Sequence, residues 1–255
     1  MNRLGIGSIK LIRSVIFIVC CLILSSLFLR PSTDLPAVHA SMHYLFHPGF
    51  GTATIDGNVE VNEWANADTY TSAMYGSDLT GTLHVMQSST NLYLGFVVDD
   101  DELTVGYKWG LTGDTLEIEF DDNNSGTLFE VGENKIAIMP GDPWLYDHYF
   151  INNTGSSEDD VIQPGGQANG EGYLTRQGDD NHFEVRFPLC SGDAYDFCLS
   201  PGDIVGLRIK YSDMYEDNST LEIITNVYPV SGNDELVTIE IMDYFYNCYL
   251  PLIQN

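Results

Sequence analysis

Apolar and polar residues alternate in short segments along most of the chain after residue 80. In the segment 114–120 the apolar residues fall on one side of an extended chain and the polar ones on the other: Leu116, Ile118 and Phe120 against Thr115, Glu117 and Glu119. This period of two predicts a half-buried β-strand with one apolar face and one acidic face. Further strands are expected at 82–87, 92–98, 135–139, 172–176, 182–187, 204–211, 221–226 and 236–241.

The segments between these strands are rich in residues that favour turns, notably Gly, Asn, Asp, Ser and Pro in 152–170. No helical period of ten or more residues follows the N-terminal region. Short strands at this spacing are typical of two-layered all-β domains. We therefore predict one all-β domain over residues 41–255, an antiparallel β-sandwich of the jelly-roll or immunoglobulin-like kind.

The first 40 residues have the pattern of an export signal. Three basic residues precede an apolar run at 14–29, and Val38-His39-Ala40 supplies a small-x-small cleavage pattern. We predict that residues 1–40 are a signal peptide and that the protein is secreted to the extracellular space. The apolar run is a little short for a membrane span. An uncleaved anchor, which would tether the protein to the cell surface through residues 14–29, is the alternative.

The chain is strongly acidic. It has 37 Asp and Glu against 10 Lys and Arg, a formal net charge of −27. Residues 1–40 hold four of the basic residues and one acid, so residues 41–255 keep 6 basic and 36 acidic residues, a charge of −30. Such a surface repels phosphate backbones, which excludes nucleic acid as a partner. It attracts Ca²⁺, tolerates neutral ligands and keeps a secreted protein soluble.

Five cysteines divide by position. Cys20 and Cys21 belong to the export signal, whereas Cys190 and Cys198 bracket the turn-rich segment SGDAYDF. In an oxidising compartment we expect Cys190 and Cys198 to form a disulfide that closes a short loop. Cys248 has no obvious partner, so a different pairing or a free thiol stays open.

The turn DDNNSG at 121–126 resembles the opening of a calcium loop. Asp121, Asn123 and Ser125 place oxygen atoms at alternate positions, and Gly126 follows where a sharp turn is needed. We predict that these three residues bind a structural calcium ion. The glutamate and the flanking helices of an EF-hand are missing, so a simple turn without metal is the alternative.

The sequence carries none of the common catalytic motifs, neither a nucleophile elbow nor a zinc-protease, P-loop or dinucleotide signature. Glu117 and Glu119 could suggest a glycosidase pair. Two residues apart on a strand, however, they lie side by side at about 7 Å instead of facing each other across a cleft. We predict that the protein is not an enzyme.

Four segments occur in an order that resembles the family 9 carbohydrate-binding modules. They are IDGNVEVNEW at 55–64, TNLYLGFVVDD at 90–100, WGLTGDTLEIEFDDNNSG at 109–126 and GDIVGLRIKYSDMYEDN at 202–218. The wider superfamily, including sandwiches of the DOMON type, shares several of these segments. The resemblance implies a secreted, non-catalytic β-sandwich that bears calcium and binds the ends of polysaccharide or oligosaccharide chains between two Trp side chains.

The resemblance also implies roles for particular residues. Trp109 matches one stacking Trp, and Glu117 matches a carboxylate that hydrogen-bonds sugar hydroxyls. The chemistry is sound, because the C–H faces of a sugar stack on an aromatic ring and a carboxylate accepts from adjacent hydroxyls. The second Trp is missing near 226–233, where Tyr228 is the nearest substitute.

Two other functions stay open. The domain could be a cell-surface interaction or structural module that keeps the fold without a sugar ligand, as the missing second Trp suggests. It could also be a haem-binding electron-transfer domain of the DOMON type, with axial ligands drawn from Met86, Met139 and His148. The sequence has no C-x-x-C-H motif for covalent haem attachment.

Overall fold

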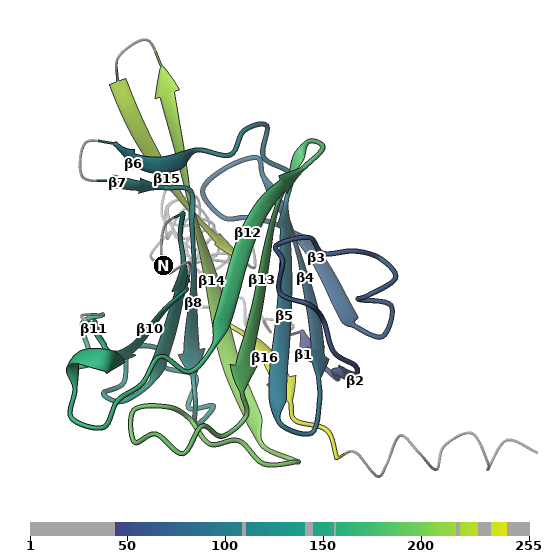
Figure 1. The fold of residues 1–255 in the computed structure, drawn as a ribbon, viewed down its shortest axis with the longest axis vertical. Coiled ribbons are helices and arrows are strands. Elements are labelled where there is room, and N and C mark those ends of the chain that lie inside the picture. Colours follow the sequence, from purple (N-terminus) through teal and green to yellow (C-terminus); the bar gives the residue numbers. More distant parts are fainter. Residues whose placement is uncertain are drawn as a thin grey trace, which may run out of the picture. The chain divides into compact units, whose positions relative to one another are not determined.

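A computed structural model describes residues 44–108, 111–140, 145–155, 157–217, 220–228 and 236–243. All of them belong to one compact unit, residues 41–255, in which two β-sheets pack face to face (Figure 1). Within the described part of the chain, no helix has the length and apolar character that a membrane span requires.

In the described residues the larger sheet has eight strands. Their order is β1 (Leu45–Phe46), β16 (Val237–Glu240), β14 (Ile204–Asp217), β8 (Thr115–Asp121), β9 (Asn134–Ile138), β10 (Leu145–Phe150) and β11 (Ser157–Asp159). The remaining strand, β15 (Thr220–Tyr228), pairs with the second half of β14, whereas β16 pairs with its first half. The long β14 therefore joins three neighbours.

The smaller sheet has six strands among the described residues. Their order is β12 (Glu171–Gln177), β13 (Asp180–Pro188), β5 (Asn91–Val98), β4 (Thr80–Gln87) and β2 (Gly49–Phe50), and β3 (Asp68–Ala73) also pairs with β4. A separate ribbon consists of β6 (Val105–Lys108) and β7 (Leu111–Gly113), and a single 3₁₀ turn, η1 (Asp160–Ile162), follows β11.

The predicted all-β sandwich is confirmed, and every strand expected from alternation is present. The ladders are antiparallel except for two short pairs, β1 with β16 and β2 with β4, which are parallel. Alternation did not predict β3 or β10. In β10 the inward position is taken by Asp147, a buried carboxylate that accepts a hydrogen bond from the backbone of Asn169 (2.8 Å), so no apolar period is visible there.

Aromatic rings from both sheets meet in the core. Phe183 of β13 packs edge-on against Tyr211 of β14, with ring centroids 5.8 Å apart. Phe96 of β5 packs in the same way against Tyr228 of β15 at 5.2 Å. All four side chains are fully buried, so they bury large apolar areas and hold the two sheets together.

The segment before β3 covers the outer face of the smaller sheet. Trp64 lies over Gly95 of β5, where a Cβ atom would come within 3.2 Å of the indole ring. Below it, the buried carboxylate of Glu184 accepts hydrogen bonds from the indole Nε1 of Trp64 and from the backbone N–H groups of Asp56, Gly57 and Asn58. This contact fixes the 55–64 segment to the sheet.

Candidate functional site

Five charged side chains lie together on the outer face of the larger sheet. They alternate with core residues along β8, β9 and β14, so the pleat turns them away from the core. We call this group the charged face; it consists of Glu117, Glu119, Lys135, Arg208 and Lys210. The alternation that predicted the strand 114–120 also predicted its acidic side, but not the cations that oppose it.

The register arranges these residues in two rows across the sheet. One row runs from β14 to β10 through Lys210, Glu117, Ala137 and Tyr146. The next row contains Arg208, Glu119, Lys135 and His148. Each row therefore contains a carboxylate, at least one basic group and an aromatic ring, spread over four neighbouring strands.

The ion pairs of the charged face differ in burial. Glu119 is 1% exposed and holds two cations, Arg208 through Nε at 2.8 Å and Nη2 at 2.6 Å, and Lys210 through Nζ at 2.5 Å. The ring of Phe129 covers both cations, with its centroid 5.0 Å from Arg208 Cζ and 5.5 Å from Lys210 Nζ. This group, buried at Glu119 and Arg208 and partly exposed at Lys210, holds β8 and β14 together and positions the face.

The second ion pair is open to solvent. Glu117 Oε1 lies 2.6 Å from Lys135 Nζ, and the two side chains are 27% and 15% exposed. Two strands away, Tyr146 is half-buried on the same face, with its ring 6.4 Å from that of His148. A carboxylate, an ammonium group and an aromatic ring are thus accessible together, which is what recognition of a polyhydroxylated ligand requires.

Sequence reasoning missed Tyr146 and the cations of the charged face. Tyr146 belongs to β10, whose outward residues Tyr146 and His148 alternate with Leu145 and Asp147. Because the inward Asp147 is polar, apolar and polar residues do not alternate there, and no local signal revealed the strand. No local pattern pairs Arg208 or Lys210 with Glu119, because about 90 residues separate them along the chain.

The two aromatic residues predicted to stack on a ligand have different outcomes. Trp109 lies outside the described residues. The prediction that Tyr228 faces a ligand was wrong. Its side chain is fully buried, and its hydroxyl donates to the backbone oxygen of Tyr70 (2.7 Å). The reason is register, since Tyr228 pairs with the core residue Ile209 and therefore points inward.

The predicted calcium residues form a turn closed by its own hydrogen bonds. The carboxylate of Asp121 accepts from the backbone N–H groups of Ser125 (2.8 Å) and Gly126 (2.7 Å). The side-chain amide of Asn123 donates to Glu130 (2.8 Å). Asn124 and Gly126 adopt positive φ angles of 52° and 80°, as a tight turn requires. The carboxylate oxygens of Asp121 thus stabilise the turn itself.

Two neighbouring carboxylates fit a cation better. Asp122 Oδ1 and Glu133 Oε1 are buried and have no hydrogen-bond partner among the described residues. Burial, together with the nearby negative charge of Asp121, raises the pKa of Asp122 to about 7 and that of Glu133 to about 8. Among the described residues, no group of three or more His, Cys, Asp or Glu side chains converges as a complete metal site. Calcium would need backbone and water oxygens as well.

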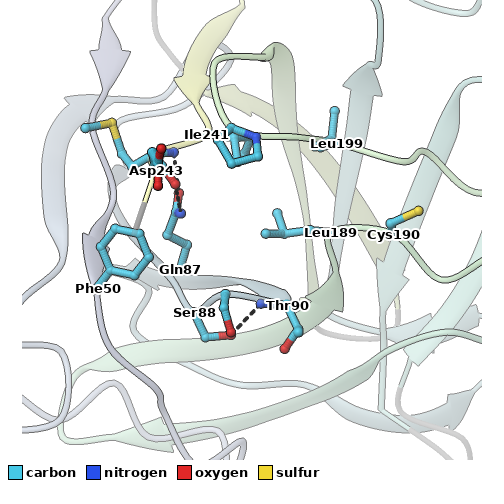
Figure 2. Close-up of a pocket in the computed structure, with 12 residues that line it drawn as sticks. Phe50, Gln87, Ser88, Thr90, Leu189, Cys190, Leu199, Ile241 and Asp243 are labelled. Carbon is cyan, nitrogen blue, oxygen red and sulfur yellow. Dashed lines mark hydrogen bonds between the residues drawn. The ribbon is translucent and has the colours of Figure 1, made fainter. Parts of the chain in front are cut away.

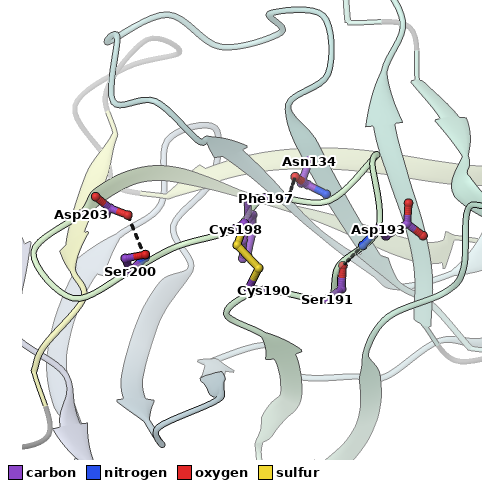
Figure 3. Close-up of a disulfide and its surroundings, with 8 residues drawn as sticks. All are labelled: Asn134, Cys190, Ser191, Asp193, Phe197, Cys198, Ser200 and Asp203. Atoms are coloured by element: carbon purple, nitrogen blue, oxygen red, sulfur yellow. Dashed lines mark hydrogen bonds between the residues drawn. A yellow bond between two sulfur atoms is a disulfide. The ribbon is translucent and has the colours of Figure 1, made fainter.

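The predicted disulfide is confirmed. Cys190 and Cys198 are bonded and also form an antiparallel bridge after β13 (Figure 3). The loop between them places Phe197 in the core, where its ring packs on that of Phe120 with the centroids 5.2 Å apart. The side-chain oxygen of Asn134 accepts a hydrogen bond from the backbone N–H of Phe197 at 2.9 Å. Cys248 lies outside the described residues.

A cavity of about 350 Å³ lies near the β4–β5 turn (Figure 2). Phe50, Leu189, Leu199 and Ile241 line it with apolar surface, and Ser88 and Thr90 add hydroxyl groups. The amide of Gln87 exchanges two hydrogen bonds with the backbone of Met242 at its wall, at 2.7 and 2.9 Å. None of the charged-face residues lines this cavity.

Comparison with known families decides the relationship. Residues 55–229 match the model of the carbohydrate family 9 binding domain-like family. The chain belongs to this family. Family 9 domains are non-catalytic, so the prediction that the protein is not an enzyme is confirmed. Comparison of the sequence with curated proteins finds no match.

Solved structures agree with the family 9 sandwich. A family 9 carbohydrate-binding module from Caldicellulosiruptor kristjanssonii in complex with cellotriose is 15% identical, with a TM-score of 0.52 over 78% of this chain and 93% of that one. The same kind of module in complex with glucose gives 16% identity, a TM-score of 0.52 and coverage of 77% and 95%. A protein from Bacteroides uniformis is 7% identical, with a TM-score of 0.50 over 77% of this chain and 97% of that one. These likenesses show the fold.

The residues considered for a haem do not meet in this family 9 domain. Met86 is buried with Trp64 on the outer side of the smaller sheet, whereas His148 lies on the outer face of the larger sheet. His148 lies opposite Lys135 of β9, whereas Met139 comes four residues later, just after the end of that strand. Axial ligands must face each other across one haem plane, and these three side chains do not.

Proposed function

We propose that this family 9 domain binds an oligosaccharide or the end of a polysaccharide on the outer face of its larger sheet. The observation that carries the proposal is the accessible Glu117–Lys135 pair, which stands beside the half-buried Tyr146. Family membership supports the ligand class, and two structural neighbours are complexes with cellotriose and with glucose.

The chemistry of the pair suits sugar hydroxyls. The carboxylate of Glu117 accepts hydrogen bonds from two adjacent hydroxyl groups, while the ammonium of Lys135 donates to their oxygens. The ion pair keeps both side chains extended on the sheet, so little side-chain entropy is lost on binding. Ala137 lies between Glu117 and Tyr146 in the same row and adds no bulk there.

An aromatic ring supplies the apolar half of the site. We propose that Trp109 stacks on the C–H face of the sugar, as the family resemblance implies, and that Tyr146 takes the second position instead of the buried Tyr228. Tyr146 shares the face with Glu117, two strands away, a separation of about 10 Å that admits one pyranose ring between them.

Structural calcium is part of the proposal, with a changed ligand set. Asp122 and Glu133 would hold the ion, because their buried oxygens have no partner among the described residues and gain one in the metal. Bound calcium would supply positive charge that offsets the desolvation of these carboxylates. Asp121, Asn123 and Ser125 would contribute by shaping the turn beside it.

We also propose that the protein works outside the cell. The signal-like residues 1–40, the disulfide and the acidic composition all suit secretion or anchorage at the cell surface.

The test is calorimetric titration of the purified protein, in the presence of calcium, with glucose, cellotriose and other neutral oligosaccharides. Glu117→Gln should weaken binding about tenfold, because a charge-assisted hydrogen bond becomes a neutral one. Glu171→Gln, an exposed glutamate on β12 paired with Arg186, is the matched control and should bind like the wild type. A folded protein that binds no saccharide would overturn the proposal and favour an interaction module.

A further inference from the structure

Basic residues are scarce in this protein, and they gather at one place. Outside residues 1–40 the sequence has six Lys and Arg residues. Three of them, Lys135, Arg208 and Lys210, lie on the charged face. With Glu117 and Glu119 this gives a local charge of +1 in a chain segment that carries −30 in total.

We infer that the charged face prefers a saccharide that carries a carboxylate, such as a hexuronic acid residue. This inference rests on the proposed sugar site and names the ligand class that the site takes. It differs from the neutral ligands of the structural neighbours, cellotriose and glucose.

Two ammonium groups approach the same strand from opposite sides. Lys135 reaches from β9 to Glu117, and Lys210 reaches from β14 to Glu119, at 2.6 and 2.5 Å. Glu117 and Glu119 are two residues apart on β8, about 7 Å along the strand, so the two ammonium groups bind neighbouring carboxylates on one face. One group can bind the carboxylate of a uronic acid while the other binds its ring hydroxyls.

Both ammonium groups keep donors to offer. Each has three N–H bonds, and among the described residues each makes one hydrogen bond. Lys135 is 15% exposed and Lys210 is 24% exposed, so the remaining donors can reach solvent or a ligand. The carboxylate of Glu119 accepts from both Arg208 and Lys210, so these two cations share it.

The basic residues of the smaller sheet are used differently. Arg186 forms a one-to-one pair with Glu171 at 2.8 Å. Arg176 donates to the backbone oxygens of Asp100 and Asp101, each at 2.8 Å. Among the described residues, neither guanidinium lies over an aromatic ring as Arg208 and Lys210 do over Phe129.

The overall negative charge does not oppose this preference at contact. At physiological ionic strength charges separated by more than about 8 Å are largely screened, so distant acids affect the approach of an anion more than its binding. The ammonium groups, by contrast, touch the ligand and form charge-assisted hydrogen bonds.

The experiment compares cellotriose with cellotriuronic acid, its counterpart carrying a carboxylate at each C6, by calorimetric titration in the presence of calcium. We expect the uronate to bind about tenfold more tightly, the gain of one charge-assisted hydrogen bond. Lys210→Met keeps the stem under Phe129 and removes the charge; it should abolish the preference for the uronate over cellotriose. Arg186→Met removes one charge from the other sheet and should keep the preference.

The outcomes separate the two proposals. Cellotriose binding as tight as, or tighter than, the uronate overturns the uronate preference and leaves the sugar site standing. A preference that persists in Lys210→Met, or that disappears equally in Arg186→Met, overturns the role of this face. Absence of binding to both ligands overturns the sugar site itself. The thermal unfolding midpoint of each variant establishes that it is folded.

Discussion

The indole Nε1 of Trp64 donates to the carboxylate of Glu184 at 2.8 Å, across 120 residues of sequence. The other oxygen of Glu184 accepts from three consecutive backbone N–H groups, those of Asp56, Gly57 and Asn58. One buried carboxylate thus closes the turn of the IDGNVEVNEW segment and holds its Trp on the sheet. The residues by which the sequence resembles its family serve here to attach the N-terminal segment to the fold.

Replacing the carboxylate of Glu184 should destabilise the folded protein. In Glu184→Gln one acceptor oxygen becomes an NH₂ group that faces a donor, so at least one buried N–H loses its partner. We expect a loss of about 2–4 kcal/mol in the free energy of unfolding, measured with urea and followed by Trp fluorescence. The exposed Glu171→Gln should change it by less than about 0.5 kcal/mol. Equal effects of the two substitutions would contradict this account.

Acid should loosen the same segment through His182. Its Nδ1 accepts the backbone N–H of Val59 (3.2 Å), which requires an unprotonated nitrogen, and burial lowers the pKa of His182. The unfolded chain therefore binds a proton at higher pH than the folded chain, and this contribution to stability is lost as pH falls through about 6.5. His182→Asn keeps an acceptor without the titration. The stability advantage of the wild type over this variant should shrink between pH 7.5 and 5.5 in urea unfolding, whereas a constant difference would contradict the prediction.

Calcium and pH should act on stability together. The pKa of Glu133 is raised by burial to about 8 and that of Asp122 to about 7, so without calcium the folded state binds more protons than the unfolded state between about pH 4 and 8. These groups make stability fall as pH rises through that window. Asp114 and Asp213, raised by burial to about 7 and about 6, act in the same direction. Calcium should raise the unfolding temperature more at pH 8 than at pH 5, because ionised carboxylates bind it.

The variant Glu133→Gln tests that relationship. It should flatten the fall in unfolding temperature with pH in EGTA and should reduce the gain from calcium at pH 8. Thermal unfolding at both pH values, with EGTA or with calcium chloride, provides the four measurements for each protein. An identical calcium response in wild type and variant would exclude Glu133 as a ligand.

Two tyrosines should respond oppositely to substitution. Tyr228→Phe removes the hydrogen bond to the Tyr70 backbone and should cost about 1 kcal/mol of stability without changing saccharide affinity. Tyr146→Ala should leave stability within about 1 kcal/mol, because the side chain is only half-buried, and should weaken saccharide binding about fivefold to tenfold. Calorimetric titration and urea unfolding distinguish the two. Loss of affinity in Tyr228→Phe would restore Tyr228 to the site.

Local patterns were sufficient for much of this protein. The period-two alternation in 114–120 and 182–187 predicted β8 and β13, because burial of one sheet face imposes that period on the sequence. The spacing of Cys190 and Cys198 predicted their disulfide, because a bond that closes a short loop needs only local geometry. The same acidic alternation predicted that Glu117 would point away from the core.

Contacts between distant segments could be decided only by the tertiary structure. Strand register turned Tyr228 inward and brought Tyr146 to the face of Glu117, and no local pattern encodes register between strands far apart in the chain. The pairing of Glu119 with Arg208 and Lys210, and the buried oxygens of Asp122 and Glu133, likewise depend on how strands and loops pack. Sequence alone thus determined nine of the strands, and the polar side of those in which apolar and polar residues alternate. The folded structure decided which polar residues share a face, because that depends on the pairing and packing of strands that are distant in sequence.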